Sequence, residues 1–559
     1  MDSRAPSNPP IMSKAAIAEL EMFDAPVARR TSVKESISAQ VFAFGLTASF
    51  FLLELVNILH HALWRDEMQV WIAAERSHSL MECLRLKTYE DIGHPDLWHV
   101  LVYPVSRLTS NPMGLQLLHM LLATITAYVI ARYSPFTRWQ KALIVFGYFP
   151  FYEYAVVSHD YALGVLAIFS FCAAFRPGPR KNYVVLAALL AVMAESNIYA
   201  LMIALSFVFM MVLEAVRSPE PRQFFFPNVR RVLFAAMLFF AVTLSSVSRM
   251  LAPADSGFVR PWHFPLDVSS AGRTVAMMWK VFLPVPEFSR QFWNSNIVTG
   301  PLASVLSLVV LFASVLFFVR KPLILFLYTS GLGALFFFKH AKYAGFLRND
   351  GHAFILFLAC LWLAVAYPEE RFPVLSADRI ARWFAPYRRR VLVSLLVIHV
   401  AVAVIASAIA FKVPFSQAKA TAEFLRAKHM DGMFIVGDPD APLLTLAGYL
   451  HREIYYLRGD RMGSYVIWNG KRLVDPKQSP LQAGMAKAAE RHEDVLVIVT
   501  RPAQVFDASI QEVASFAGSV VGSEDYYIYL VKYEKASSHQ DSGKTAYGRL
   551  AGSLKIAGA

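Results

Sequence analysis

Two adjacent carboxylates, Asp66 and Glu67, follow directly after the first long apolar run of the chain. A carboxylate at a membrane boundary costs solvation free energy unless it pairs with a cation, binds a ligand or takes part in a reaction. If a partly apolar setting raises its pKa, an ionised carboxylate can act as a general base toward a hydroxyl group. Trp64 and Trp71 flank the pair with rings of the kind that line sugar sites. The alternative is an interfacial salt bridge with Arg65 or Arg76.

A second polar group is expected beside this pair. Glu153, His159 and Asp160 fall at a turn between two apolar runs, where a compact set of such side chains could bind an acceptor or another substrate. The alternative is a helical hairpin whose tip is simply polar. His94, Asp96 and His99, which follow the carboxylate pair, could extend the acidic site. Interfacial anchoring by Trp98 and His99 is the alternative.

A third group is cationic. Five potentially positive side chains crowd one loop that the topology below places on the outer face: Lys339, His340, Lys342, Arg348 and His352. Arginine offers a planar fork and lysine a point charge to a phosphate oxyanion, so this loop predicts a phosphate site. Attraction to anionic lipid headgroups is the alternative interpretation.

The sequence carries no signature of a metal or other cofactor, and dependence on a divalent cation stays open. Cys83, Cys172 and Cys360 lie far apart and lack the spacing of metal ligands or of a disulfide framework. His60 and His61 are adjacent on an expected helix, so their side chains point in different directions.

The elements that must position these groups are membrane helices. Hydrophobic residues make up 56% of the 559 residues and charged residues only 17%, against roughly 25% in soluble domains. Apolar runs of membrane length predict a polytopic α-helical protein with about eleven crossings. The expected spans are 39–60, 113–132, 139–157, 160–176, 182–195, 197–216, 229–250, 300–319, 321–338, 351–367 and 391–411.

Basic residues set the expected orientation, because short cytosolic loops hold an excess of Lys and Arg. That bias also explains the net charge of +13 better than nucleic-acid binding does. The basic residues assigned to the cytosol are Arg29, Arg30, Arg176, Arg180, Lys181, Arg217, Arg222, Arg230, Arg231, Arg320, Lys321, Arg371, Arg379, Arg382 and Arg388 to Arg390. The outer face then receives 61–112, 153–160, 195–197, 251–299, 339–350 and everything after 411.

The region after residue 411 reads as a small α/β domain, since short runs of β-formers alternate with helical stretches. Strands are expected at 433–437, 453–457, 495–500 and 526–531, and helices near 416–429, 441–450, 480–492 and 507–518. The predicted organisation is a disordered cytosolic tail (1–36), a membrane domain (37–411), a periplasmic α/β domain (412–534) and a disordered tail (535–559).

The first span, the Asp66-Glu67 pair and the His94-Pro95 that opens an interfacial helix at 96–108 resemble the GT-C-type integral membrane glycosyltransferases. The protein O-mannosyltransferases and the bacterial aminoarabinose transferases of lipid A are nearest in pattern, over roughly residues 39–411. The resemblance implies a hexosyl- or pentosyltransferase of the bacterial inner membrane with a periplasmic site. It would move a sugar from a polyprenyl-phosphate donor to an envelope glycan, lipid or protein.

Residue roles also come with the resemblance. Asp66 matches the catalytic acidic residue of the first outer loop, here the expected general base of an inverting transfer, and Glu67 is its acidic companion. The stretch 342–348 resembles the segment that contacts the carrier phosphate. Asp160, or His159, matches a second polar residue, although many members carry an Arg-rich segment at that turn.

Two other classes remain open alternatives. A glycolipid transporter or flippase would place polar groups near the bilayer midplane, often in inverted repeats. A glycan polymerase or ligase would use arginines of a large outer loop, such as Arg260, Arg273 and Arg290 within 251–299. Polar groups at one membrane boundary and the lack of a repeat favour the transferase.

Overall fold

The computed structural model describes residues 33–225, 229–257 and 261–534. The expected tail 535–559 and residues 1–32 of the expected tail 1–36 lie outside these residues, as do Arg29, Arg30 and Arg260. The first helix, α2 (Val33–His60), begins inside the predicted tail and continues through the first predicted span.

Every predicted span contains a helix, which confirms a polytopic α-helical membrane protein. Beside α2 these are α6 (Met113–Tyr133), α7 (Arg138–Val145), α8 (Tyr161–Ala174), α9 (Tyr183–Ala194), α10 (Ile198–Arg217), α12 (Val229–Met250), α15 (Gly300–Leu316), α16 (Pro322–Ala341), α18 (His352–Ala364) and α20 (Arg388–Lys412). Among the described residues, 6 helices are long and apolar enough to cross a membrane, and α8, α9 and α15 are shorter apolar helices.

The predicted span 139–157 is not one helix. It divides into α7 and a π-helical segment, η1 (Tyr148–Glu153), which is followed by turns up to residue 160. Pro150 lacks the N–H that an α-helix interior would use at that position, which disfavours a regular α-helix through this run. The Tyr154 N–H instead donates to the Phe149 carbonyl oxygen at 2.8 Å, the wider closure of a π turn.

The close pair α9 and α10 forms two separate, contacting helices, as predicted. The side-chain oxygen of Asn197 accepts the Ala200 N–H at 2.9 Å and so caps the start of α10.

Shorter helices lie in the connections on the side of the predicted outer loops. They are α3 (Arg65–Arg76), α4 (Leu80–Glu90), α5 (Leu97–Leu108), α13 (Val268–Val275), α14 (Met277–Phe282) and α17 (Leu347–Asp350). The other connections carry α11 (Arg222–Phe225), α19 (Leu375–Phe384) and the 3-10 turn η3 (Ala385–Tyr387). The helix expected at 96–108 is thus present as α5.

The C-terminal region folds around a six-stranded sheet of order β3-β2-β1-β4-β6-β5. Its strands are β1 (Phe434–Asp438), β2 (Ile454–Tyr456), β3 (Arg461–Gly463), β4 (Val495–Val499), β5 (Ile510–Phe516) and β6 (Tyr526–Val531), and its helices are α21 (Ala418–Ala427), α22 (Asp440–Leu450) and α23 (Pro480–Arg491). Strand β1 pairs in parallel with β2 and β4, so the predicted α/β region is confirmed.

The helix predicted at 507–518 is wrong, because this stretch forms the edge strand β5. Apolar residues at 510, 513, 514 and 516 suggest a helical spacing, but β6 offers a free edge and pairs antiparallel with the stretch. A register shift between Glu512 and Ala514 lets the spacing fit the sheet.

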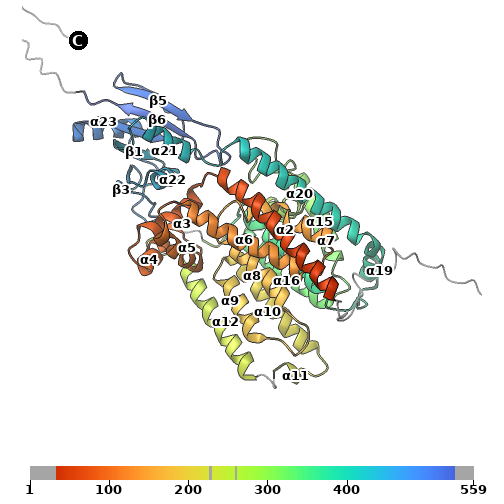
Figure 1. The fold of residues 1–559 in the computed structure, drawn as a ribbon. Coiled ribbons are helices and arrows are strands. Elements are labelled where there is room, and N and C mark those ends of the chain that lie inside the picture. The colour runs from red at the N-terminus through yellow and green to blue at the C-terminus, as the bar shows by residue number, and fades with distance from the viewer. Residues whose placement is uncertain (1–32, 226–228, 258–260, 535–559) are drawn as a thin grey trace, which may run out of the picture.

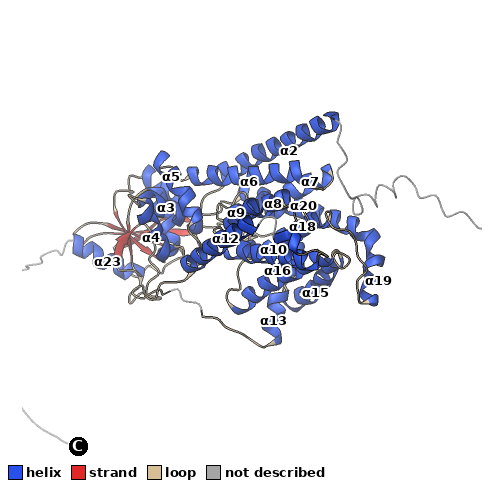
Figure 2. Cartoon of the chain, turned by 90° about the horizontal axis from the view of Figure 1, so that it is seen from below, coloured by secondary structure: helices blue, strands red, loops and turns tan. Residues whose placement is uncertain are grey.

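The predicted outer and cytosolic segments gather at opposite ends of the helical bundle. The sheet lies at one end beside α3, α4 and α5, while α2 and α20 run away from it (Figures 1 and 2). At the other end the predicted cytosolic segments pair with one another, as Arg217 does with Glu370 at 2.9 Å and Arg388 with Glu369 at 2.7 Å. These contacts agree with the way in which the predicted spans assign the connecting segments to the two sides of the membrane.

Candidate active site

Glu67 fixes the start of helix α3 against two other segments. Its carboxylate is fully buried and accepts the Trp64 N–H at 3.1 Å, which closes the helix N-terminus. It also accepts the Ser158 N–H at 2.6 Å and a bond from His61 Nε2 at 2.9 Å. Both oxygens therefore bind the protein itself, and Glu67 ties the end of α2, the start of α3 and the turn after η1 together.

Asp66, the neighbouring residue, faces a different environment. Its side chain is 22% exposed, and its Oδ2 atom lies 2.5 Å from Nη2 of Arg348. Arg65 Nε lies 3.5 Å from the other carboxylate oxygen. The first outer loop and the loop before α18, 282 residues apart in sequence, thus meet in one ion pair.

The electrostatics of Asp66 differ from the expectation that an apolar setting raises its pKa. Burial does act in that direction, but the positive charges of Arg348 and Arg65 outweigh burial and hold the pKa of Asp66 below its usual value. In this arrangement the carboxylate is ionised and weakly basic, because Arg348 already stabilises its charge.

Arg348 lies among aromatic rings. Its guanidinium carbon is 5.2 Å from the ring centre of Trp64, 5.6 Å from that of Trp293 and 5.7 Å from that of Tyr161, and its side chain is 7% exposed. Its Nε and Nη1 atoms have no hydrogen-bond partner among the described residues. Buried donors without partners cost free energy, so this guanidinium is suited to receive an anion.

Glu153 supports the ring of Trp293. It is buried and accepts hydrogen bonds from the Tyr148 hydroxyl at 2.7 Å and from the Trp293 indole N–H at 3.2 Å. The residue predicted to bind substrate therefore holds one wall of the Arg348 site.

The remaining members of the predicted phosphate group turn elsewhere. Lys339 pairs with Asp350 at 2.9 Å. His340 lies 2.9 Å from the Thr274 hydroxyl, and its other ring nitrogen donates to the Pro265 carbonyl oxygen at 2.8 Å.

Lys342 contacts an aromatic ring, and His352 bonds to the backbone of its own helix start. The Lys342 ammonium is 5.3 Å from the ring centre of Trp262. His352 is fully buried at the start of α18, where Nδ1 donates to the Asn349 carbonyl oxygen at 3.1 Å. Of the five, Arg348 is the member that the structure brings to Asp66.

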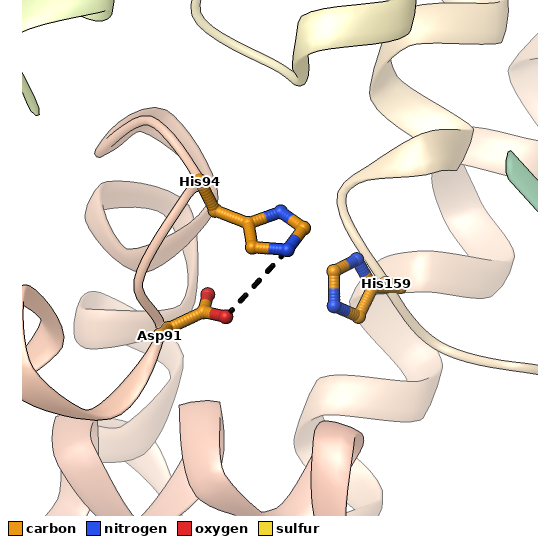
Figure 3. Close-up of side chains that lie close together, drawn as sticks. All are labelled: Asp91, His94 and His159. Atoms are coloured by element: carbon orange, nitrogen blue, oxygen red, sulfur yellow. Dashed lines mark ion pairs between the residues drawn. The ribbon is translucent and has the colours of Figure 1, made fainter. Parts of the chain in front are cut away.

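The predicted acidic extension is assembled around Asp160. Its Oδ2 accepts from Nδ1 of His94 at 2.7 Å and its Oδ1 from Nδ1 of His159 at 2.5 Å. Asp91 lies near both rings, and Figure 3 shows its carboxylate and the two imidazoles pointing toward one another. The ring of His159 stacks on that of Tyr161 at 4.8 Å between centres, and Arg348 lies over the same tyrosine ring, so the two groups adjoin.

Asp96 binds two cationic side chains that were not among the predicted site residues. It pairs with Arg249 at 2.6 Å and with the buried Lys87 at 3.3 Å. Arg249 ends an apolar run on the predicted outer side, against the bias of basic residues toward the cytosol, and that departure is the signal that could have found it. Asp91 stands three residues before His94, and this ligand-like spacing is the sequence signal that could have found it.

The α/β region contributes to the same site. The Arg65 N–H donates to Oε1 of Glu524 at 2.8 Å, and the Leu63 N–H donates to the Tyr449 hydroxyl at 2.9 Å. Burial raises the pKa of Glu524 to about 7, although Ser416 and Arg65 oppose it. The contribution of Glu524 had no local signal in the sequence.

No family model and no curated protein matches this chain. Among solved structures it is similar to ArnT from Cupriavidus metallidurans bound to undecaprenyl phosphate, at 12% identity and a TM-score of 0.46, over 88% of this chain and 98% of that one. It is also similar to the arabinofuranosyltransferase AftD from Mycobacteria, at 11% identity and a TM-score of 0.32, over 87% of this chain and 40% of that one.

Proposed function

We propose that this protein is a membrane glycosyltransferase that moves a sugar from a polyprenyl-phosphate donor to a hydroxyl of an envelope glycan, lipid or protein. The observation that carries the proposal is the Asp66–Arg348 ion pair, with unpartnered guanidinium N–H groups inside aromatic walls. A base and an anion receptor in direct contact are the two parts that such a transfer needs.

Donor binding prepares the base. The donor phosphate carries a negative charge that competes with Asp66 for Arg348, and Nε and Nη1 of the guanidinium are the donors available to it. As the phosphate neutralises Arg348, the main cause of the low pKa of Asp66 weakens. The carboxylate thereby becomes more basic when donor is present.

The transfer itself is one displacement. Asp66 takes the proton of the acceptor hydroxyl, and the hydroxyl oxygen forms a bond to the anomeric carbon. The bond from that carbon to the phosphate oxygen breaks, and its electron pair leaves with the carrier phosphate, whose charge Arg348 stabilises. Attack opposite the leaving group inverts the anomeric centre.

Aromatic rings surround the proposed phosphate site. Trp64 and Trp293 meet edge to face at 5.0 Å between ring centres, and both also contact Phe415. Such rings exclude water from Arg348, which strengthens its interaction with phosphate in the low local dielectric.

The proposed orientation places this site outside the cytosol, in the periplasm of a bacterial inner membrane. It is supported by the basic segments 176–181, 217–222 and 388–390, which belong to the end of the bundle away from Asp66. A lipid-linked donor would reach Arg348 from the bilayer.

A strain that lacks this chain tests the proposal. Mass spectrometry of its envelope glycolipids, polysaccharides and glycoproteins should reveal one missing sugar, which the wild-type chain restores and the Asp66→Asn variant does not. An unchanged envelope, or full restoration by a stably expressed Asp66→Asn variant, would contradict the proposed reaction.

A further inference from the structure

Three side chains that can bind metal ions converge next to the Asp66 site. Asp91 and His94 come from the turn between α4 and α5, and His159 comes from the turn before α8 (Figure 3). One ligand atom of each lies within 4.8 Å of the others. Asp91 and His159 are buried and His94 is half-buried, so the three form an internal cluster.

Asp160 fixes how the two imidazoles present themselves. Because each Nδ1 donates to one oxygen of this buried carboxylate, the Nε2 atom of each ring is left as the lone-pair donor when the ring is neutral. His94 Nε2 lies 3.8 Å from Oδ1 of Asp91. A carboxylate that orients a metal-binding histidine through its other nitrogen is a recurrent feature of zinc sites.

His99 provides an independent observation. Its ring is 1% exposed, and neither ring nitrogen has a hydrogen-bond partner among the described residues. Its Nε2 lies 4.0 Å from Oδ2 of Asp91. A buried imidazole with no hydrogen-bond partner costs free energy. If Oδ1 of Asp91 bound an ion, a small shift of the carboxylate would let its Oδ2 accept a hydrogen bond from His99.

We propose that Asp91, His94 and His159 bind one divalent transition-metal ion of the zinc type, with Asp160 and His99 as positioning residues. Two imidazole nitrogens and one carboxylate oxygen are a donor set that zinc accepts, and three protein ligands leave a position for water or a substrate oxygen. Zinc bonds of about 2.0–2.1 Å put tetrahedral ligands about 3.4 Å apart. Ligand atoms that lie up to 4.8 Å apart would therefore approach one another by up to about 1.4 Å on binding.

The ion would stabilise the arrangement of the segments around Asp66. It joins the turn at 91–94 to His159, whose neighbour Ser158 holds Glu67 through its backbone N–H. Two negative charges, of Asp91 and Asp160, are balanced by the same ion. The proposal stands on this geometry and does not depend on the transferase activity.

Metal content of the full-length protein tests the inference. The chain is purified in detergent with a tag that contains no histidine, stripped with a chelator, equilibrated with Zn²⁺ and analysed by elemental mass spectrometry. We expect one tightly held equivalent, and Co²⁺ in its place should give the visible absorption of a low-coordinate site with nitrogen ligands. Metal content equal to that of a matched membrane protein without the cluster would overturn the proposal.

Variants locate the ion. His94→Gln combined with His159→Gln should lose the equivalent, while His492→Gln, on an exposed turn of the α/β region, should keep it. Asp160→Asn, which leaves the ligands in place, should weaken affinity by about 10–100-fold. Retention of the full equivalent by the folded double variant sinks the assignment. If the double variant does not fold, an unchanged affinity of Asp160→Asn for Zn²⁺ would contradict the proposal instead.

Discussion

At the scale of single residues, the Asp66–Arg348 pair makes the sharpest prediction. Asp66→Asn keeps the size of the side chain but removes the proton acceptor, so transfer should fall by about 10²–10⁴-fold. The rate is measured on purified protein with polyprenyl-phosphate sugar, and thermal unfolding is measured alongside. Asp475→Asn, at an exposed position, is the control that should retain the rate. A rate within a few-fold of wild type would remove Asp66 from the base role.

Arg348→Lys separates charge from geometry. Lysine keeps the positive charge but loses the fork that can bind Asp66 and a phosphate together. Loss of one charged hydrogen bond of about 1.5–3 kcal/mol should raise the donor KM by about 10–100-fold. Arg273→Lys, on an exposed helix of the outer loop, should leave it unchanged. Equal donor KM values for both variants would mean that Arg348 does not receive the phosphate.

Some of the site residues could be predicted from the sequence and others could not. Asp66 stood out because a carboxylate at a membrane edge is costly whatever surrounds it. The expected order of the spans put the loop of Arg348 on the same side as Asp66, but it did not distinguish Arg348 from the other four cationic candidates of that loop. The bonds of Glu67 could not be foreseen, because they depend on a backbone N–H of Ser158, which any residue type but proline supplies.

At the scale of elements, the hydrogen bonds of Glu67 connect the end of α2, the start of α3 and the turn after η1. Glu67→Gln keeps its shape but replaces a charged acceptor that binds three groups, so unfolding free energy should fall by about 2 kcal/mol. We expect a lower Tm and a lower rate with an unchanged donor KM. Glu512→Gln, exposed on β5, is the matched control. An unchanged Tm in Glu67→Gln would show that the hydrogen bonds of Glu67 do not contribute to the stability of the protein.

Two elements show where local sequence patterns fail. The π-helical segment lies in an apolar run that reads as one span, and only Pro150 hinted at the break. For β5 the partner strand decides, because β6 lies alongside and its free N–H and C=O groups must be bonded. Both departures depend on neighbours distant in sequence or on backbone bonds that hydropathy does not report.

At the scale of the whole molecule, the distribution of positive charge predicted which segments share an end of the bundle. Contacts such as Asp66–Arg348 at one end and Arg388–Glu369 at the other agree with it. The contribution of the C-terminal region to the active site was not foreseen. A separate α/β unit has its own core, and nothing in its hydropathy indicates what it docks against.

The proposed orientation can be tested by cysteine labelling. The native cysteines, Cys83, Cys172 and Cys360, are all buried, so background reaction should be low. A membrane-impermeant maleimide should label Asp475→Cys in intact spheroplasts and Arg379→Cys only after lysis, because both positions are exposed but belong to opposite ends. The reverse pattern would place the site on the cytosolic side.

Glu524 couples the α/β region to the membrane region in a pH-dependent way. Its pKa is about 7 in the folded protein against an ordinary 4.5, so the folded state binds a proton more tightly than the unfolded state does. The resulting stabilisation is fully present below pH 4.5 and is lost as the pH rises through 7. Unfolding followed at pH 5 and pH 8 should therefore show a larger loss of stability in wild type than in Glu524→Gln.

Glutamine can still accept the Arg65 N–H, and it removes the charge that Asp66 opposes and Arg65 favours. The variant should therefore approach wild type at pH 5 and exceed it at pH 8. Parallel pH profiles of the two proteins would mean that Glu524 is not protonated in the folded state near neutral pH. In that case the contact between the sheet and α3 would be held by the Leu63–Tyr449 bond and apolar packing without a contribution from this proton.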